Sequence, residues 1–184
     1  AGRHIGSQAN DGLSWLRANL NPPMAEHLSF RIGNQLFFVF VEAAEFQFSN
    51  GKDLFMKVAK EATAIPCIMP MQEHLTDYAP SAANWGLVSA IDGREINPLQ
   101  LVSNELIEMS DWELHDFGIQ VVRSSLTDNG KNVFSAQSSL HIDPSIWFEE
   151  NGVAYWVVVR TVRHPEKNAI VPANIDDIAD NCRH

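Results

Sequence analysis

The stretch HIDPSIWFEENGVAYWVVVRTVRHP, residues 141–165, decides which fold class this chain is expected to adopt. Two runs of apolar and aromatic residues lie on either side of Asn151-Gly152, a dipeptide that favours the tight turn of a β-hairpin. Asp143 stands just before the first run, and the second run ends in two arginines. The stretch therefore predicts a hairpin whose strands cover residues 145–150 and 153–163.

Helices and further hairpins are expected along the rest of the chain. Apolar periodicity, turn dipeptides and capping residues predict these elements. In the first half of the chain they are loose residues 1–10, a helix over 11–20, a hairpin over 28–43 that turns at Gly33-Asn34, a helix containing Leu54, Val58 and Ala59, and a strand over 65–69. In the second half they are a long loop over 72–85, a hairpin over 85–97 that turns at Asp92-Gly93, helices over 98–109 and 110–129, a strand over 131–137 and a closing helix over 175–181. This alternation indicates an α/β fold with a mixed sheet built from β-hairpins flanked by helices. A length of 184 residues suffices for a single domain, 1–184, and an internal boundary would fall near residues 97–99.

Three of these elements carry further expectations. The second arm of the hairpin over 28–43 is apolar on both faces, which is typical of a central strand. The helix over 110–129 begins with Ser110 and Glu113 at capping-box spacing. Its expected apolar face consists of Leu114, Phe117, Val121 and Val122. Trp156, in the second strand of the hairpin over residues 145–163, is expected in the core.

The charge balance disfavours nucleic acid as a partner. The chain has 13 Lys and Arg against 23 Asp and Glu, for a formal net charge of −10, and such a field repels phosphate. Protein or small-molecule partners are favoured. No apolar run reaches the length of about 20 residues that a membrane helix needs, and the N-terminus lacks the apolar core of a signal peptide. We therefore expect a cytoplasmic protein with free thiols at Cys67 and Cys182.

Several common catalytic and metal-binding motifs are absent from the sequence. It contains no HExxH or Cys-x-x-Cys spacing for zinc, no glycine-rich phosphate loop and no G-x-S-x-G elbow. Glu73-His74 could act as a general acid or ligand pair, although a solvated loop is the favoured interpretation. The apolar setting of Cys67 argues for inert burial rather than nucleophilic chemistry.

From Ser110 onward, the order helix, strand, aspartate, strand, tight turn, strand and helix resembles the core of the PD-(D/E)XK nuclease superfamily. The resemblance covers about 75 residues and implies a restriction-endonuclease-like C-terminal half. Asp143 corresponds to the first metal-binding aspartate, although proline follows it here rather than precedes it. Glu113 is the candidate for the glutamate of the helix. Val158-Val159-Arg160 stands where the family has an acid, a spacer and a lysine.

The departures from that pattern argue against nuclease chemistry. Mg²⁺ needs clustered oxygen ligands, and valine at 158 removes one of them; a shifted register offers only Trp156 or Val162. Arginine keeps the charge of the family's lysine but cannot lose its proton to act as a base. If the resemblance holds, Arg160 would replace the metal as a bidentate counter-charge to Asp143 and Glu113.

We therefore expect a non-catalytic binding protein without a cofactor. Its partner would be a protein, with a basic partner favoured by charge, in an inhibitor, immunity or adaptor role; self-association is left open. The alternative is a divergent Mg²⁺-dependent nuclease that uses Asp143, with Glu113 or Glu149 completing the ligands and Arg160 in place of the lysine. A purely structural interpretation also stands, in which Asp143 opens a turn and Arg160 is a solvated strand-end charge.

Overall fold

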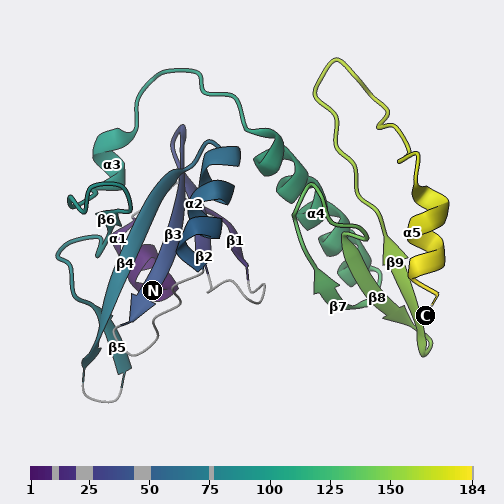
Figure 1. Cartoon of the computed structure of the whole chain (residues 1–184), viewed down its shortest axis with the longest axis horizontal. Coiled ribbons are helices and arrows are strands. Elements are labelled where there is room, and N and C mark those ends of the chain that lie inside the picture. Colours follow the sequence, from purple (N-terminus) through teal and green to yellow (C-terminus); the bar gives the residue numbers. More distant parts are fainter. Residues whose placement is uncertain (10–12, 20–26, 44–50, 75–76, 184) are drawn as a thin grey trace. The chain divides into compact units, whose positions relative to one another are not determined.

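The chain has an α/β fold, as the sequence predicts. The computed structural model describes residues 1–9, 13–19, 27–43, 51–74 and 77–183. These fall into two compact units, residues 1–108 and 109–184 (Figure 1). In the described part of the chain, no helix has the length and apolar character needed to cross a membrane. The sequence predicts a single domain over residues 1–184, with any internal boundary near residues 97–99, and this stays a prediction.

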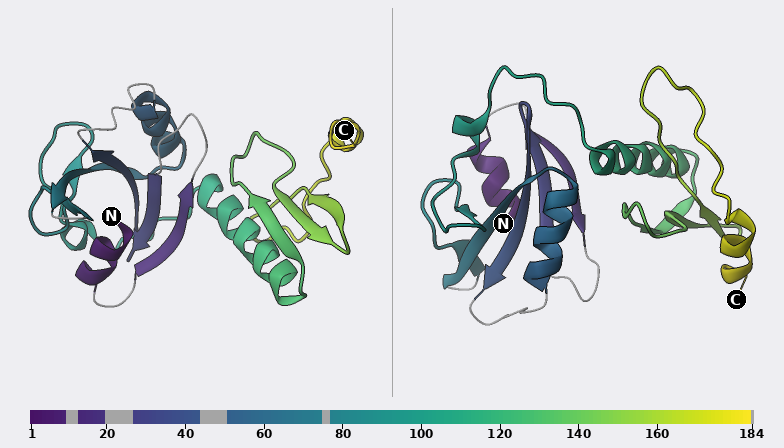
Figure 2. Two further views of the ribbon diagram at one scale, coloured as in Figure 1. Left: turned by 90° about the horizontal axis from the view of Figure 1, so that it is seen from below. Right: turned by 45° about the horizontal axis from the view of Figure 1, so that its top comes forward.

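The N-terminal unit is built around a curled mixed sheet, which Figure 2 shows from two further directions. Its strands, in their order along the sheet, are β1 (Leu13–Asn19), β2 (His27–Ile32), β3 (Gln35–Ala43), β4 (Ile65–His74) and β5 (Asp77–Pro80), with β6 (Val88–Ser89) paired to β4. Strands β3 and β4 are parallel, and helix α2 (Gly51–Glu61) lies between them in the chain. The remaining pairs are antiparallel.

The hairpin of β2 and β3 supplies most of this unit's core, as its apolar pattern predicts. Gly33, at the first turn position, has φ +55°, a value that glycine adopts without strain. All side chains from Leu36 to Phe40 are buried, and the rings of Phe30 and Phe37 stack with centroids 5.1 Å apart. Because β3 pairs with β2 on one side and β4 on the other, the expectation of a central strand is confirmed.

The predictions for the first twenty residues were wrong. Residues expected to be loose form helix α1 (Gly2–Gln8), since Ile5 is fully buried in the core and fixes the segment. The predicted helix over 11–20 is a strand where it is described, β1, paired with β2. Backbone pairing at a sheet edge outweighs weak local helical spacing. Residues 10–12 and 20 lie outside the described part.

Two predictions in the second half of this unit need correction, and two hold. The predicted loop over 72–85 contains the end of β4 and all of β5. The predicted helix over 98–109 is only α3 (Pro98–Leu101). The helix stops early because the Asn34 side chain forms hydrogen bonds with the backbone of the next segment. Asn34 Oδ1 accepts from the Ser103 N–H at 3.0 Å, and Asn34 Nδ2 donates to the Glu105 carbonyl at 2.9 Å. Helix α2 and the Asp92-Gly93 turn are present as predicted.

The C-terminal unit consists of a helix packed on an antiparallel meander, followed by a second helix. Its elements are α4 (Asp111–Asp128), β7 (Asn132–Ala136), β8 (Ile146–Glu150), β9 (Val153–Val157) and α5 (Ile175–Asn181), and the sheet has the order β7-β8-β9. Asn151 and Gly152 have φ +53° and +78°, which are values of a type I′ turn. The predicted hairpin is therefore confirmed, although its second strand ends at Val157 rather than at residue 163. The expectation that Trp156 lies in the core was wrong, because Trp156 pairs with Trp147, on the face opposite to Ile146, and is only half-buried.

Helix α4 packs on the core with only part of the face that was predicted. The capping box is confirmed, because Ser110 Oγ accepts from the Glu113 N–H and the Glu113 carboxylate accepts from the Ser110 N–H. Phe117 and Val121, however, are 52% and 54% exposed. The buried cluster instead joins Ile119 to the sheet. Val122 packs against this cluster as predicted, so the expected face was wrong for Phe117 and Val121 and right for Val122.

Candidate functional site

The centre of the candidate site is an ion pair between the loop before β8 and the segment after β9. Arg160 Nη1 donates to Asp143 Oδ1 at 2.9 Å, and Arg160 Nη2 donates to Asp143 Oδ2 at 2.5 Å. The side chains are 30% and 16% exposed, respectively. The hydrogen bonds that the guanidinium donates to Asp143 raise the pKa of Arg160. The bidentate pairing expected for these two residues is present, and it engages both carboxylate oxygens.

A buried histidine of α4 lies within the electrostatic reach of this ion pair. His115 is 3% exposed, and its Nε2 has no hydrogen-bond partner among the described residues. Burial lowers the pKa of His115, and the positive charge of Arg160 lowers it further, while Asp143 acts in the opposite direction. The imidazole is therefore neutral at neutral pH, and the fixed guanidinium carries the positive charge of the site.

The two other acidic candidates have different settings. Glu113 is buried, at 3% exposure, and its carboxylate accepts from the backbone N–H of Ser110 at 3.0 Å, which stabilises the start of α4. Glu149 is exposed in β8, where it pairs with Ala154 of β9. Successive side chains of a strand point to opposite faces, so Glu149 and the core residue Ile146 lie on opposite faces of the sheet.

The loop that carries Asp143 is held from inside by Gln137. Its Nε2 donates to the Ile142 carbonyl at 2.5 Å, and its Oε1 accepts from the Ser139 N–H at 2.7 Å. Two large aliphatic side chains nevertheless face solvent at the tip of the loop, Leu140 at 43% and Ile142 at 53% exposure. The arrangement is an internally hydrogen-bonded loop that presents an apolar tip.

Sequence reasoning did not find Gln137 or His115. A signal for His115 exists in its spacing, since it lies three residues after Trp112 and four before Ile119, both of which are buried on the same helix. Gln137 has a weaker signal: a long amide side chain at a strand end, ahead of a loop that contains no glycine. Its partners are backbone groups, so its role becomes visible only with the path of the loop.

The candidate site does not assemble a metal centre in the described part of the chain. There, no group of three or more His, Cys, Asp or Glu side chains is placed to hold an ion. Both oxygens of Asp143 already accept from Arg160, so an ion would have to displace a guanidinium. Glu73 and His74, the other pair considered, are exposed at the end of β4.

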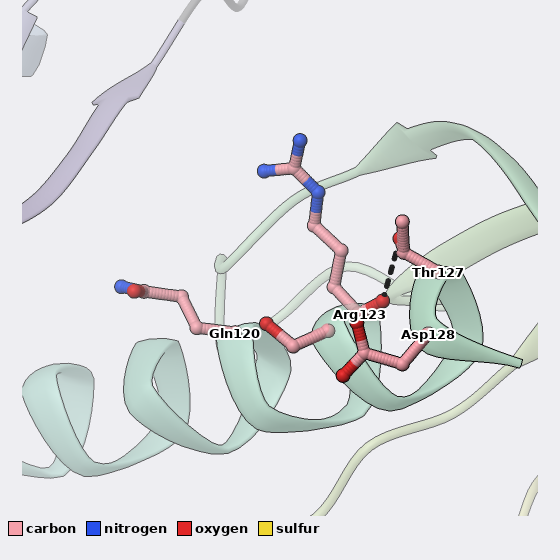
Figure 3. A pocket seen from close by; sticks show the side chains of 5 residues that line it. Gln120, Arg123, Thr127 and Asp128 are labelled. Carbon is pink, nitrogen blue, oxygen red and sulfur yellow. Dashed lines mark hydrogen bonds between the residues drawn. The ribbon is translucent and has the colours of Figure 1, made fainter.

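A polar hollow on α4 offers little chemistry. Figure 3 shows side chains that line it, which come from successive turns of this one helix: Gln120, Arg123, Ser124, Thr127 and Asp128. Thr127 Oγ1 donates to the carbonyl of Arg123 at 3.0 Å, a bond within the helix. The residues have the composition of a solvated helix face.

Comparison with known proteins assigns a family model to one part of the chain. Residues 112–184, which run from the first turn of α4 to the C-terminus, match the model of a domain of unknown function, DUF8840. Neither the curated proteins nor the solved structures gave a match. The match covers nearly all of the C-terminal unit, so the candidate site lies inside the similar region.

Proposed function

We propose that the chain is a non-catalytic binding protein whose C-terminal unit recognises a protein partner. The observation that carries this proposal is the bidentate pair of Arg160 and Asp143. A guanidinium occupies the carboxylate that a hydrolytic metal site would use, and it cannot supply a base. In this proposal the unit is a nuclease-like scaffold without nuclease chemistry, which acts as an inhibitor, an immunity protein or an adaptor.

The loop over residues 137–145 supports a role in recognition. Gln137 fixes its backbone from within, and the pair of Asp143 and Arg160 fixes its end. A loop that is ordered before a partner arrives loses less conformational entropy on binding. The exposed side chains of Leu140 and Ile142 supply apolar surface at a position where loops are usually polar.

The charge of the C-terminal unit favours a basic partner. Residues 109–184 contain eleven Asp and Glu and six Lys and Arg. Four of the six cations already form ion pairs within the unit: Lys131 with Glu150, Arg160 with Asp143, Arg163 with Asp111, and Arg183 with Asp180. The charge that remains for a partner is therefore mainly negative, which accelerates association with a cationic surface.

The proposal is tested by comparing capture on the full chain with capture on a loop variant. Leu140→Ser combined with Ile142→Ser removes the apolar tip, and Phe117→Ser removes a comparably exposed side chain from α4 as a control. We expect a protein from the native host to be retained by the wild type and the control but lost from the loop variant, with all three folded by thermal melting. Equal retention of the partner by the wild type and both variants would contradict a role of the loop in recognition.

A parallel measurement tests the nuclease alternative. An ion that binds only the native state raises the melting temperature as its concentration increases. We expect Mg²⁺ and Mn²⁺ to leave the melting temperature of the wild type unchanged. A rise that disappears in Asp143→Ala, together with DNA cleavage, would favour the alternative with Asp143 and Glu113 or Glu149 as ligands.

A further inference from the structure

An aromatic strip crosses the face of the β7-β8-β9 sheet opposite to its core. Trp147 of β8 lies directly across from Trp156 of β9. Phe134 of β7 belongs to the same strip, because a bulge between Val133 and Ser135 turns it toward Trp147. The rings of Phe134 and Trp147 have centroids 6.5 Å apart and planes tilted by 33°. We define the aromatic strip as Phe134, Trp147 and Trp156.

The strip is open to solvent at the β7 end. Phe134 is 57% exposed, and Trp147 and Trp156 are half-buried. The core on the other face is formed by Ile146 and its neighbours together with α4, so the strip is not needed to close that core. An exposed phenyl ring resting on a tryptophan is typical of a binding surface.

A carboxylate lies beside the strip on the same face. Glu149 is two residues after Trp147 along β8, and side chains two apart in a strand share a face. Two residues of a strand span about 7 Å, which is within the reach of a guanidinium stacked on a ring. Glu149 is exposed and forms no ion pair with another described side chain. The nearest acid along the chain, Glu150, is paired with Lys131.

We propose that the strip and Glu149 form a docking site for a positively charged side chain, arginine or lysine, on an extended segment of a protein partner. The face of an aromatic ring attracts a cation, with tryptophan the strongest, and a carboxylate at the rim fixes its position. Anionic and neutral ligands gain nothing from Glu149 or from the net negative charge of the unit. This inference rests on the proposed function, for which it names the chemistry of the partner.

The test measures peptide binding to the full chain by fluorescence anisotropy. The probes are a labelled peptide of alternating arginine and glycine and the same peptide with citrulline, the neutral isostere, at every arginine. We expect the arginine peptide to bind at low salt and the citrulline peptide to bind about tenfold more weakly. Equal binding of both peptides, or no binding of the arginine peptide, would overturn the inference.

Matched variants localise the site. Phe134→Leu and Glu149→Gln should each weaken binding of the arginine peptide by about two- to fivefold. Phe117→Leu removes a similarly exposed ring from α4, and Glu166→Gln removes another exposed carboxylate; both variants should bind the peptide as the wild type does. If Glu166→Gln weakens binding as much as Glu149→Gln, only bulk charge attracts the peptide and the site is refuted.

The peptide-binding test of the docking site can fail independently of the capture test of the proposed function. If the arginine peptide fails to bind while capture still depends on Leu140 and Ile142, the docking site is wrong and the binding role stands. If capture does not depend on the loop but the variants at Phe134 and Glu149 weaken peptide binding, the docking site stands and the loop is not the recognition surface.

Discussion

Replacing Arg160 with alanine should destabilise the protein far more than replacing an arginine at the surface. Asp143 is only 16% exposed, and both of its oxygens accept from Arg160. Removing one partner of a fully buried pair costs about 3–5 kcal/mol because the other charge is left uncompensated. Since Arg160 is 30% exposed, water can reach part of the site, and we expect a loss of about 2 kcal/mol. For a chain of this length, that loss lowers the melting temperature by about 4–8 °C.

The assay is thermal melting at pH 7 with a matched arginine variant as the control. Arg183 forms an ion pair with Asp180, but the two side chains are 74% and 73% exposed. Exposed pairs of this kind contribute less than about 1 kcal/mol, so Arg183→Ala should melt close to the wild type. A double-mutant cycle with Asp143→Ala then isolates the interaction. If Arg160→Ala melts like Arg183→Ala, or the cycle gives no coupling, the ion pair does not hold the loop.

Other sites of the molecule give independent predictions. Folding lowers the pKa of the buried His115 imidazole, so the stability that the neutral imidazole contributes is present above about pH 6.5 and is lost as the pH falls. In the wild type, the urea midpoint should therefore fall between neutral and mildly acidic pH, and His115→Gln should make that fall smaller. An equal fall in both proteins would refute this. A Cβ at Gly118 would lie 2.4 Å from the Thr161 side chain, so Gly118→Ala should lower the melting temperature by an amount equivalent to about 1–3 kcal/mol, although alanine usually stabilises a helix. Burial raises the pKa of the Cys67 thiol to about 12, so thiol titration of the native chain at pH 8 should label Cys182 alone, and rapid labelling of both would contradict the buried setting.

Local chemistry explains why parts of the fold were predictable. The Asn151-Gly152 turn allows only a narrow set of backbone conformations, so it determines the hairpin in any context. The capping box of Ser110 and Glu113 likewise satisfies donors that every helix start leaves free. Elements that depend on distant partners were misjudged. Strand β1 exists through its pairing with β2, and α3 ends early where Asn34 captures the next segment.

In the candidate site, too, the features that depend on tertiary contacts were the ones that the sequence did not predict. The pairing of Asp143 with Arg160 was expected only through the resemblance to the nuclease core, because the two residues lie outside the hairpin strands, before β8 and after β9. The face of α4 that packs on the sheet depends on tertiary structure, so the exposure of Phe117 was not predicted, although the spacing of His115 from Trp112 and Ile119 fits its burial. Gln137 was missed for a related reason, because its partners are backbone atoms of a loop whose path the sequence does not specify.

Arg160 also explains how the loop over residues 137–145 can stay ordered without a bound ion. A metal would order the loop only while it was present, since its binding energy is lost when the ion dissociates. A guanidinium is covalently attached and always charged, so it pairs with Asp143 at every physiological pH without a bound ion. In the proposed function, the pair of Asp143 and Arg160 therefore keeps the loop ordered before its partner binds.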